Sequence, residues 1–345
     1  MEKSSEKYIG DSVYLINSRY SKLESKVKVL YFNYLAENKS PELFAEEVNK
    51  LWGNIDHTFM DKQIDKLKNI VHNNNIELGI DAKRLDNNKE SYHTVGDLVV
   101  DDYFSLIPEK DFKKVEKRYI QRVISNYNRS YKSIQKQNKE TYIEEKLEVY
   151  DEQINQVVAY YKKDTNKIAR YVDVSTYLSM LHNVDLTRSA WNTTLEDSRR
   201  LGTELFIIPY HPFSCEYCQQ YQNMILSRYE VEYVLGLEAE EQVGDILHPN
   251  CKCTLSIFWD NSQLQDISYT EEEQTDFYNI RQKVNNYSLK IQEMNTDKKI
   301  IEAYGNAKQL DKIKKRIKDT RQKMKDLVNT LPTEELQKEV RAIYR

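Results

Sequence analysis

The spacing of apolar residues is the feature that most restricts the fold of this chain. Apolar side chains recur alternately every three and four residues, which is the pattern of a helix packed lengthwise on another helix. The pattern runs from Ile9 to Tyr34, from Phe277 to Met294 and from Leu310 to Leu327. Only 8 glycines and 6 prolines occur in 345 residues, and 31 % of the residues are charged. A mainly α-helical protein with much solvated surface is therefore expected.

Helix start and stop signals agree with this pattern. Ser40 and Pro41 suit an N-cap and a first helical position. Thr270 and Glu273 form the sequence signature of a capping box, and Gly202 suits the end of a helix that precedes it. The same three-and-four spacing predicts helix across residues 143–161. The polar stretch 72–91 is expected to be a loop or linker.

A short segment departs from the helical pattern. The runs at residues 203–210 and 253–260 are apolar and β-like, and all four cysteines lie between them or at their edge. We therefore expect a mainly α fold with a small α+β zinc-stabilised module, in which long helical arms flank a short β-sheet. The expected divisions are an N-terminal helical arm at 1–90, a helical region at 91–202, the mixed module at 203–260 and a C-terminal helical arm at 261–345.

The cysteine spacing predicts a metal site in that module. One pair has the form Cys-x-x-Cys and the second has the form Cys-x-Cys, with a histidine three residues before it. Two short-spaced ligand pairs joined by a connecting segment are how proteins assemble a tetrahedral Zn²⁺ site. A sheet of two or three short strands has little core, so a structural metal would stabilise it. The candidate ligands are Cys215, Cys218, Cys251, Cys253 and His248.

Alternatives to this zinc assignment remain open. The first choice is the four cysteines, His248 can replace Cys253, and His211 is a further candidate. Buried free thiols, redox chemistry or disulfides are the competing interpretations. Disulfides are disfavoured for a chain made in the cytoplasm, where thiols stay reduced. Four protein ligands would leave no open coordination position, which argues against a catalytic metal.

Enzyme signatures are absent from the sequence. No dinucleotide-binding or phosphate-binding glycine loop, zinc-protease motif or nucleophile elbow occurs. The other four histidines (His57, His72, His93 and His182) are interpreted as ordinary surface or core residues. We therefore expect no enzymatic activity and no small-molecule substrate. A zinc-containing nuclease or transferase, or a zinc-ribbon DNA-binding protein, is kept as the alternative.

Positive charge is concentrated in two segments although the net charge is -4. Residues 110–139 contain ten basic and two acidic residues, and residues 308–325 contain nine and two. Such patches can neutralise phosphates, although a solvated helix face explains them as well. The candidate DNA contacts are Lys113, Lys114, Lys117, Arg118, Arg122, Arg129 and Lys132.

Membrane insertion and secretion are not expected. The N-terminal residues lack the apolar core of a signal peptide, and no uncharged apolar run approaches the ~20 residues that span a bilayer.

The cysteine segment resembles a known protein family. "YHPFSCEYCQQYQNMILS" followed by "LHPNCKCTL" is similar to the phage head morphogenesis proteins, also called minor capsid or Mu-F-like proteins. In that family a Cys-x-x-Cys-like segment runs into a Trp-Gln-Gly stretch and is followed by a His-Pro-Asn-Cys-Arg-Cys signature. Tyr221, Gln222 and Asn223 occupy the Trp-Gln-Gly places here, and Lys252 replaces the arginine. The resemblance covers roughly residues 170–260.

This resemblance implies a structural role. Family members are virion proteins of tailed bacteriophages, located inside the head near the portal, and are linked to procapsid assembly, DNA packaging or DNA ejection. The implied partners are the portal protein, the capsid or scaffold and packaged DNA. The implied locations are the capsid interior near the portal and, during assembly, the host cytoplasm.

Overall fold

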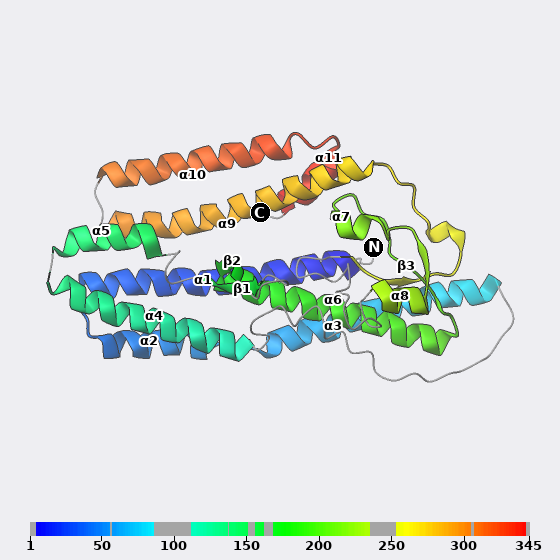
Figure 1. Cartoon of the computed structure of the whole chain (residues 1–345), viewed down its shortest axis with the longest axis horizontal. Coiled ribbons are helices and arrows are strands. Elements are labelled where there is room, and N and C mark those ends of the chain that lie inside the picture. Colours follow the sequence, from blue (N-terminus) through cyan, green and yellow to red (C-terminus); the bar gives the residue numbers. More distant parts are fainter. Residues whose placement is uncertain are drawn as a thin grey trace. The chain divides into compact units, whose positions relative to one another are not determined.

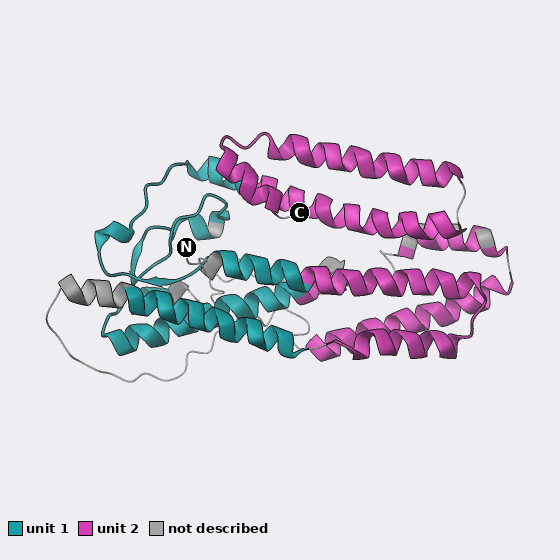
Figure 2. Ribbon diagram, turned by 180° about the vertical axis from the view of Figure 1, so that it is seen from behind, with its two compact units in different colours: residues 1–16, 56–107, 179–278 teal, residues 17–55, 108–178, 279–345 magenta. Residues whose placement is uncertain are grey.

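The structure is a computed structural model that describes residues 5–55, 57–85, 112–136, 138–150, 156–161, 168–234, 253–304 and 307–342. The chain divides into two compact units, each built from three separate stretches of sequence (Figure 2). Unit 1 comprises residues 1–16, 56–107 and 179–278, and unit 2 comprises 17–55, 108–178 and 279–345. Because several long helices pass from one unit into the other, neither unit is a continuous piece of the chain.

Helices dominate the described residues (Figure 1). The N-terminal half contains α1 (Ser5–Ala36), α2 (Pro41–Gly53), α3 (Thr58–Leu85), α4 (Phe112–Ile134) and α5 (Lys139–Tyr150). Further along the chain lie α6 (Val174–Leu201), the short helices α7 (Glu216–Gln219) and α8 (Arg228–Val234), and the 3₁₀ turn η3 (Asn261–Gln263). The C-terminal part contains α9 (Glu271–Tyr304), α10 (Ala307–Val328) and α11 (Glu334–Arg341).

Two small antiparallel sheets accompany these helices. The strands β1 (Gln156–Tyr161) and β2 (Ile168–Asp173) pair in a hairpin in unit 2. In unit 1, β3 (Leu205–Ile207) is the central strand between β4 (Ile225–Ser227) and β5 (Ser256–Ile257). Phe206 pairs with Leu226 on one side and with Ile257 on the other, and all three side chains are buried. The predicted short sheet in a mainly helical protein is therefore confirmed.

A helical core in unit 1 supports this sheet. Side chains from the start of α1, from α3 and from α6 form one apolar cluster: Tyr8, Ile9, Leu67, Val71, Leu186 and Ala190. Leu67 and Val71, like Leu186 and Ala190, are four residues apart, so each pair lies on one face of its helix. The C-terminal part of α6 then lies against the sheet through hydrogen bonds described below.

The core of unit 2 is aromatic. Phe44 of α2 stacks on Tyr127 of α4 with ring centroids 4.0 Å apart, and Tyr31 of α1 meets both rings edge to face. The Tyr31 hydroxyl lies 2.6 Å from that of Ser130, and Tyr20 donates to buried Glu116 at 2.7 Å. The many tyrosines thus supply apolar bulk while their hydroxyl groups keep hydrogen-bond partners inside the core.

The expected helix caps are confirmed. Leu43 N donates to the Ser40 side chain, with Pro41 in the first turn. Thr270 N donates to the Glu273 carboxylate at 2.8 Å and Glu273 N donates back to the Thr270 hydroxyl at 3.2 Å, which completes a capping box. Gly202 follows α6 with a φ of 73°, a left-handed conformation that glycine adopts without a steric cost.

Two local expectations were wrong. Residues 72–85 of the polar stretch predicted as a loop belong to helix α3, partly because buried Asn75 hydrogen bonds to Asp197 of α6, and the rest of that stretch lies outside the described residues. The helix predicted across 143–161 ends at Tyr150, and Val157 and Tyr161 lie in β1. β-Branched and aromatic residues favour strands. A short apolar run can fit both the helical spacing of three and four residues and the two-residue alternation of a strand. Ile154 lies outside the described residues.

Candidate functional site

The cysteine segment is held at one end of the three-stranded sheet. In antiparallel pairing, Ile207 lies opposite Ser256, so the chain leaving β3 and the chain entering β5 meet at the same end. His211 and Cys215 follow β3, and Cys253 precedes β5. The Cys253 Sγ lies 3.5 Å from the His211 Nε2, which confirms that the two segments come together there.

The three described cysteines are buried and none is in a disulfide with another described residue. Cys215 is the N-cap residue of α7, and its carbonyl accepts hydrogen bonds from the amides of Cys218 and Gln219 at 3.0 Å each. This turn places the two cysteines of the Cys-x-x-Cys pair one helical turn apart. Cys218 is completely inaccessible to solvent.

The metal prediction remains untested by this arrangement. Among the residues that the structure describes, no group of three or more histidine, cysteine or carboxylate side chains is placed to hold a metal ion. The described part provides the Cys253–His211 pair and the two buried cysteines near α7. The predicted ligands Cys251 and His248 lie outside the described residues.

Helix α6 holds the segment that leads into β5 by two hydrogen bonds. The Trp191 indole Nε1 donates to the Cys253 carbonyl at 3.0 Å, and the Thr194 hydroxyl donates to the Leu255 carbonyl at 3.2 Å. Both helix residues are buried. The two bonds satisfy carbonyls of the segment that leads into β5, a strand only two residues long. Buried carbonyls without partners would be costly, so these contacts position Cys253 as well as the sheet.

Arg228 connects the β4 edge to the same helix. Its Nη2 donates to the Ser198 hydroxyl at 2.7 Å and to the Leu195 carbonyl at 3.2 Å, and its guanidinium lies over the Phe206 ring. Ser198 lies in the last turn of α6, where a cation interacts favourably with the helix dipole. Both outer strands of the sheet are therefore anchored on α6.

A tight turn before β4 contains Asn223. This residue has a φ of 58°, in the left-handed region, and its amide donates to the Ile208 carbonyl at 2.9 Å. Its side chain accepts from the Gln265 amide at 3.3 Å and donates to the Gln265 carbonyl at 2.5 Å. Asparagine is among the few residues besides glycine that adopt this conformation readily.

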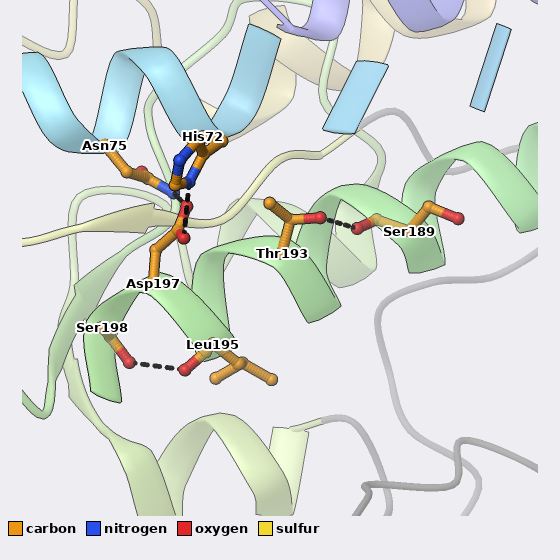
Figure 3. Close-up of polar contacts among 7 residues, drawn as sticks. All are labelled: His72, Asn75, Ser189, Thr193, Leu195, Asp197 and Ser198. Atoms are coloured by element: carbon orange, nitrogen blue, oxygen red, sulfur yellow. Dashed lines mark hydrogen bonds and ion pairs between the residues drawn. The ribbon is translucent and has the colours of Figure 1, made fainter. Parts of the chain in front are cut away.

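A histidine–aspartate pair joins α3 to α6 in unit 1 (Figure 3). The His72 Nδ1 lies 2.8 Å from the Asp197 Oδ1, and the Asn75 amide donates to the Asp197 Oδ2 at 3.0 Å. The hydroxyl groups drawn nearby donate to α6 backbone carbonyls, Thr193 to Ser189 at 2.8 Å and Ser198 to Leu195 at 2.9 Å. The contacts of buried Asp197 thus tie the two helices together.

The sequence did not single out this cluster. His72 and Asn75 are three residues apart and so lie on one helix face. The three-residue spacing of His72 and Asn75 was the one signal of the cluster in the sequence, but both residues lie in the polar stretch that was interpreted as a loop. The partner Asp197 is distant in sequence, and only the packing of α3 on α6 brings it close.

Comparison with protein families assigns residues 150–329 to the phage minor capsid protein 2 family. The chain belongs to this family. The match covers more than half of the chain, from the β1–β2 hairpin through α6, the cysteine segment, α9 and α10. It agrees with the resemblance seen in the cysteine segment. Comparisons with curated proteins and with solved structures gave no match.

Family membership identifies the chain as a structural protein of the bacteriophage head and a component of the virion. Its partners are accordingly other phage head proteins. In the described residues, no helix has both the length and the apolar character that a membrane span needs.

The candidate DNA contacts of this minor capsid protein lie on α4, outside the family match. All seven cations are exposed: Lys113, Lys114, Lys117, Arg118, Arg122, Arg129 and Lys132. The opposite face of α4 carries the buried residues, including Val115, Tyr119 and Val123. The cations therefore spread over the solvent-facing half of an amphipathic helix. Arg129 donates to the Asn126 side chain at 3.1 Å.

Proposed function

We propose that this minor head protein associates with the portal vertex, inside the capsid, and acts in procapsid assembly, DNA packaging or DNA ejection. The observation that carries the proposal is the family match across residues 150–329. The long helices α1, α9 and α10 supply extended faces of the kind that bind helical partners.

Co-expression with the portal protein of the same phage tests this association. We expect the chain to co-elute with the portal ring in size-exclusion chromatography. In the control, the chain is co-expressed with the major capsid protein instead of the portal protein, and it should not co-elute with that protein. Separate elution of the chain and the portal at micromolar concentrations would contradict portal binding.

A structural zinc site in unit 1 is part of the proposal. Its support is the burial of Cys215, Cys218 and Cys253 and the short distance between the Cys253 Sγ and the His211 Nε2. Bound as proposed, the metal would join the α7 turn to the β5 segment, and its binding energy would stabilise the fold.

Elemental analysis of the purified chain tests the zinc proposal. We expect about one zinc per chain, lost in a Cys215→Ser/Cys218→Ser variant together with the stability of unit 1. A fully folded wild-type preparation without metal would refute it.

The exposed cations of α4 are proposed to contact packaged DNA. Their support is the high local density of positive charge on one solvent-facing surface.

A further inference from the structure

Unit 2 contains a groove between α9 and α10 whose charged lining residues are all positive. Its volume is about 450 Å³. Five of its lining residues are cations and none is a carboxylate: Lys298, Lys314, Lys318, Arg321 and Lys325. Both views of the ribbon show the two helices side by side (Figures 1 and 2). Four of the cations come from α10 and the fifth from α9.

The four α10 cations form a straight stripe. Steps of four, three and four residues keep Lys314, Lys318, Arg321 and Lys325 within about 60° of one another around the helix axis. The stripe extends along roughly 16 Å of helix. It borders the buried seam that begins at Ile313, so it lies at the edge that faces α9. The α4 cations, by contrast, are spread over about half of their helix.

Most of the charge of the groove is not neutralised by ion pairs within the described residues. No ion pair is formed there by any of the four α10 cations, all of which are exposed. Lys298 pairs with Glu302 on its own helix at 3.4 Å. Like charges three or four residues apart on a helix repel one another and destabilise it. A bound polyanion would remove this repulsion.

We propose that this groove binds the sugar–phosphate backbone of duplex DNA. The inference rests on the proposed role in the phage head, where packaged DNA is the abundant polyanion. A duplex carries one charge per ~3.4 Å on each strand, so roughly 16 Å of axis presents about five phosphates of one strand. That number matches the five cations of the groove.

The composition of the groove favours this ligand over two others. Lysine is depleted in protein–protein interfaces, where aromatic anchors are enriched, and four of the five cations are lysines. An acidic protein partner is therefore disfavoured. No aromatic side chain lines the groove, so bases of single-stranded DNA would find no stacking platform. The groove therefore suits the sugar–phosphate backbone of duplex DNA, bound without preference for base sequence.

Fluorescence anisotropy of the full chain with a labelled 30-base-pair duplex, between 50 and 200 mM NaCl, tests the proposal. The groove variant combines Lys314→Gln, Lys318→Gln, Arg321→Gln and Lys325→Gln. Its plot of log affinity against log salt should be shallower than that of the wild type by about 3.6, at 0.9 per phosphate contact. Glutamine is about as good a helix former as lysine, so α10 should persist in circular dichroism.

A matched control lies on the same helix. Lys312→Gln, Lys315→Gln, Arg316→Gln and Lys323→Gln remove the same number of lysines and arginines from exposed positions outside the groove. This variant should keep the wild-type salt slope. Equal weakening in both variants would overturn the proposal, because it would show that only net charge matters.

Lysine acetylation footprinting on the wild type needs no variant. Duplex DNA should protect Lys314, Lys318 and Lys325 from acetylation, and leave Lys312, Lys315 and Lys323 reactive. Uniform reactivity would refute the groove site. So would displacement of the duplex by poly-glutamate at equal charge, which would indicate an acidic protein partner.

The two proposals can fail separately. A chain that enters phage heads, but whose groove variant keeps the wild-type salt slope and whose groove lysines stay reactive with duplex DNA present, would refute the groove site alone. A chain that binds DNA through the groove but is absent from heads would refute the proposed function alone.

Discussion

Asn223 explains one departure of this chain from the motif it resembles. The residue occupies the glycine place of the Trp-Gln-Gly stretch, and its left-handed φ of 58° shows why a glycine suits that place. Asparagine meets the backbone requirement, and its side chain adds two hydrogen bonds to Gln265. The substitution therefore keeps the turn and connects it to the segment before α9.

Substitutions at Asn223 should separate these two contributions. Asn223→Gly loses only the side-chain bonds, whereas Asn223→Ala loses them and also adopts an unfavourable left-handed conformation. We expect the alanine variant to be less stable than the glycine variant by about 1 kcal/mol in urea unfolding. Equal stability of the two variants would show that the turn does not require a positive φ.

His182 is a buried histidine whose neutral form the fold requires. Its Nε2 lies 2.9 Å from the Gln63 Oε1, so the imidazole donates to the amide oxygen, and burial lowers its pKa from 6.5 to about 4. Asp185, one turn further along α6, has the opposite tendency, because burial raises its carboxyl pKa from 3.8 to about 6.

The stability of unit 1 should depend on His182 between pH 6.5 and 4. In that range the unfolded chain binds a proton at this histidine and the folded chain does not, so stability falls as the pH falls. The full effect is about 3 kcal/mol. Asp185 acts in the opposite direction, because its folded form holds the proton more tightly. The measurement therefore uses an Asp185→Asn background.

Urea unfolding of that variant at pH 7 and pH 4.5 provides the comparison. Adding His182→Gln should abolish most of the pH dependence, since glutamine does not titrate. An unchanged pH dependence would mean that another group is responsible.

At the scale of elements, α6 is the support of the small sheet. Trp191 and Thr194 hold the β5 segment, and Arg228 brings the β4 edge to the last turns of the helix. The sheet has only three strands of two or three residues each. Sheets of this size are marginal alone, so their stability comes from packing and hydrogen bonding to the helix.

The Trp191 bond can be tested against a matched tryptophan. Trp191→Phe removes an indole that donates to the Cys253 carbonyl, and Trp52→Phe removes one whose Nε1 has no hydrogen-bond partner among the described residues. Both side chains are buried. We expect Trp191→Phe to cost more free energy of unfolding, by about 1–2 kcal/mol, because it leaves a buried carbonyl unpaired. An equal cost would assign the whole effect to lost packing.

The long helices could be predicted from the sequence because many turns repeat one spacing. The apolar seam of α9 was found in this way, and the caps at Ser40, Gly202 and Thr270 were found from the residue types that start and end helices. The β1 strand and the C-terminal half of α3 were not. A strand of six residues contains too few positions to establish a period, and Asn75 looks like a loop residue until its partner on α6 is known.

For the molecule as a whole, the sequence located the cysteine segment and its flanking strands correctly. His211 was a further candidate metal ligand from the sequence, and the structure places this residue beside Cys253. The hydrogen bonds between α3 and α6 join residues more than a hundred positions apart, which no local spacing indicates. Charge counting found the basic stretch of α10, but the contribution of Lys298 depends on how α9 packs beside it.

The central proposal is that this minor protein of the phage head is located at the portal vertex. Quantitative mass spectrometry of purified portal-containing procapsids and mature virions tests it most directly. We expect the chain in both particles, in a few copies per portal ring, and its loss from procapsids assembled without the portal. Absence from both particles, or equal incorporation without the portal, would contradict the account.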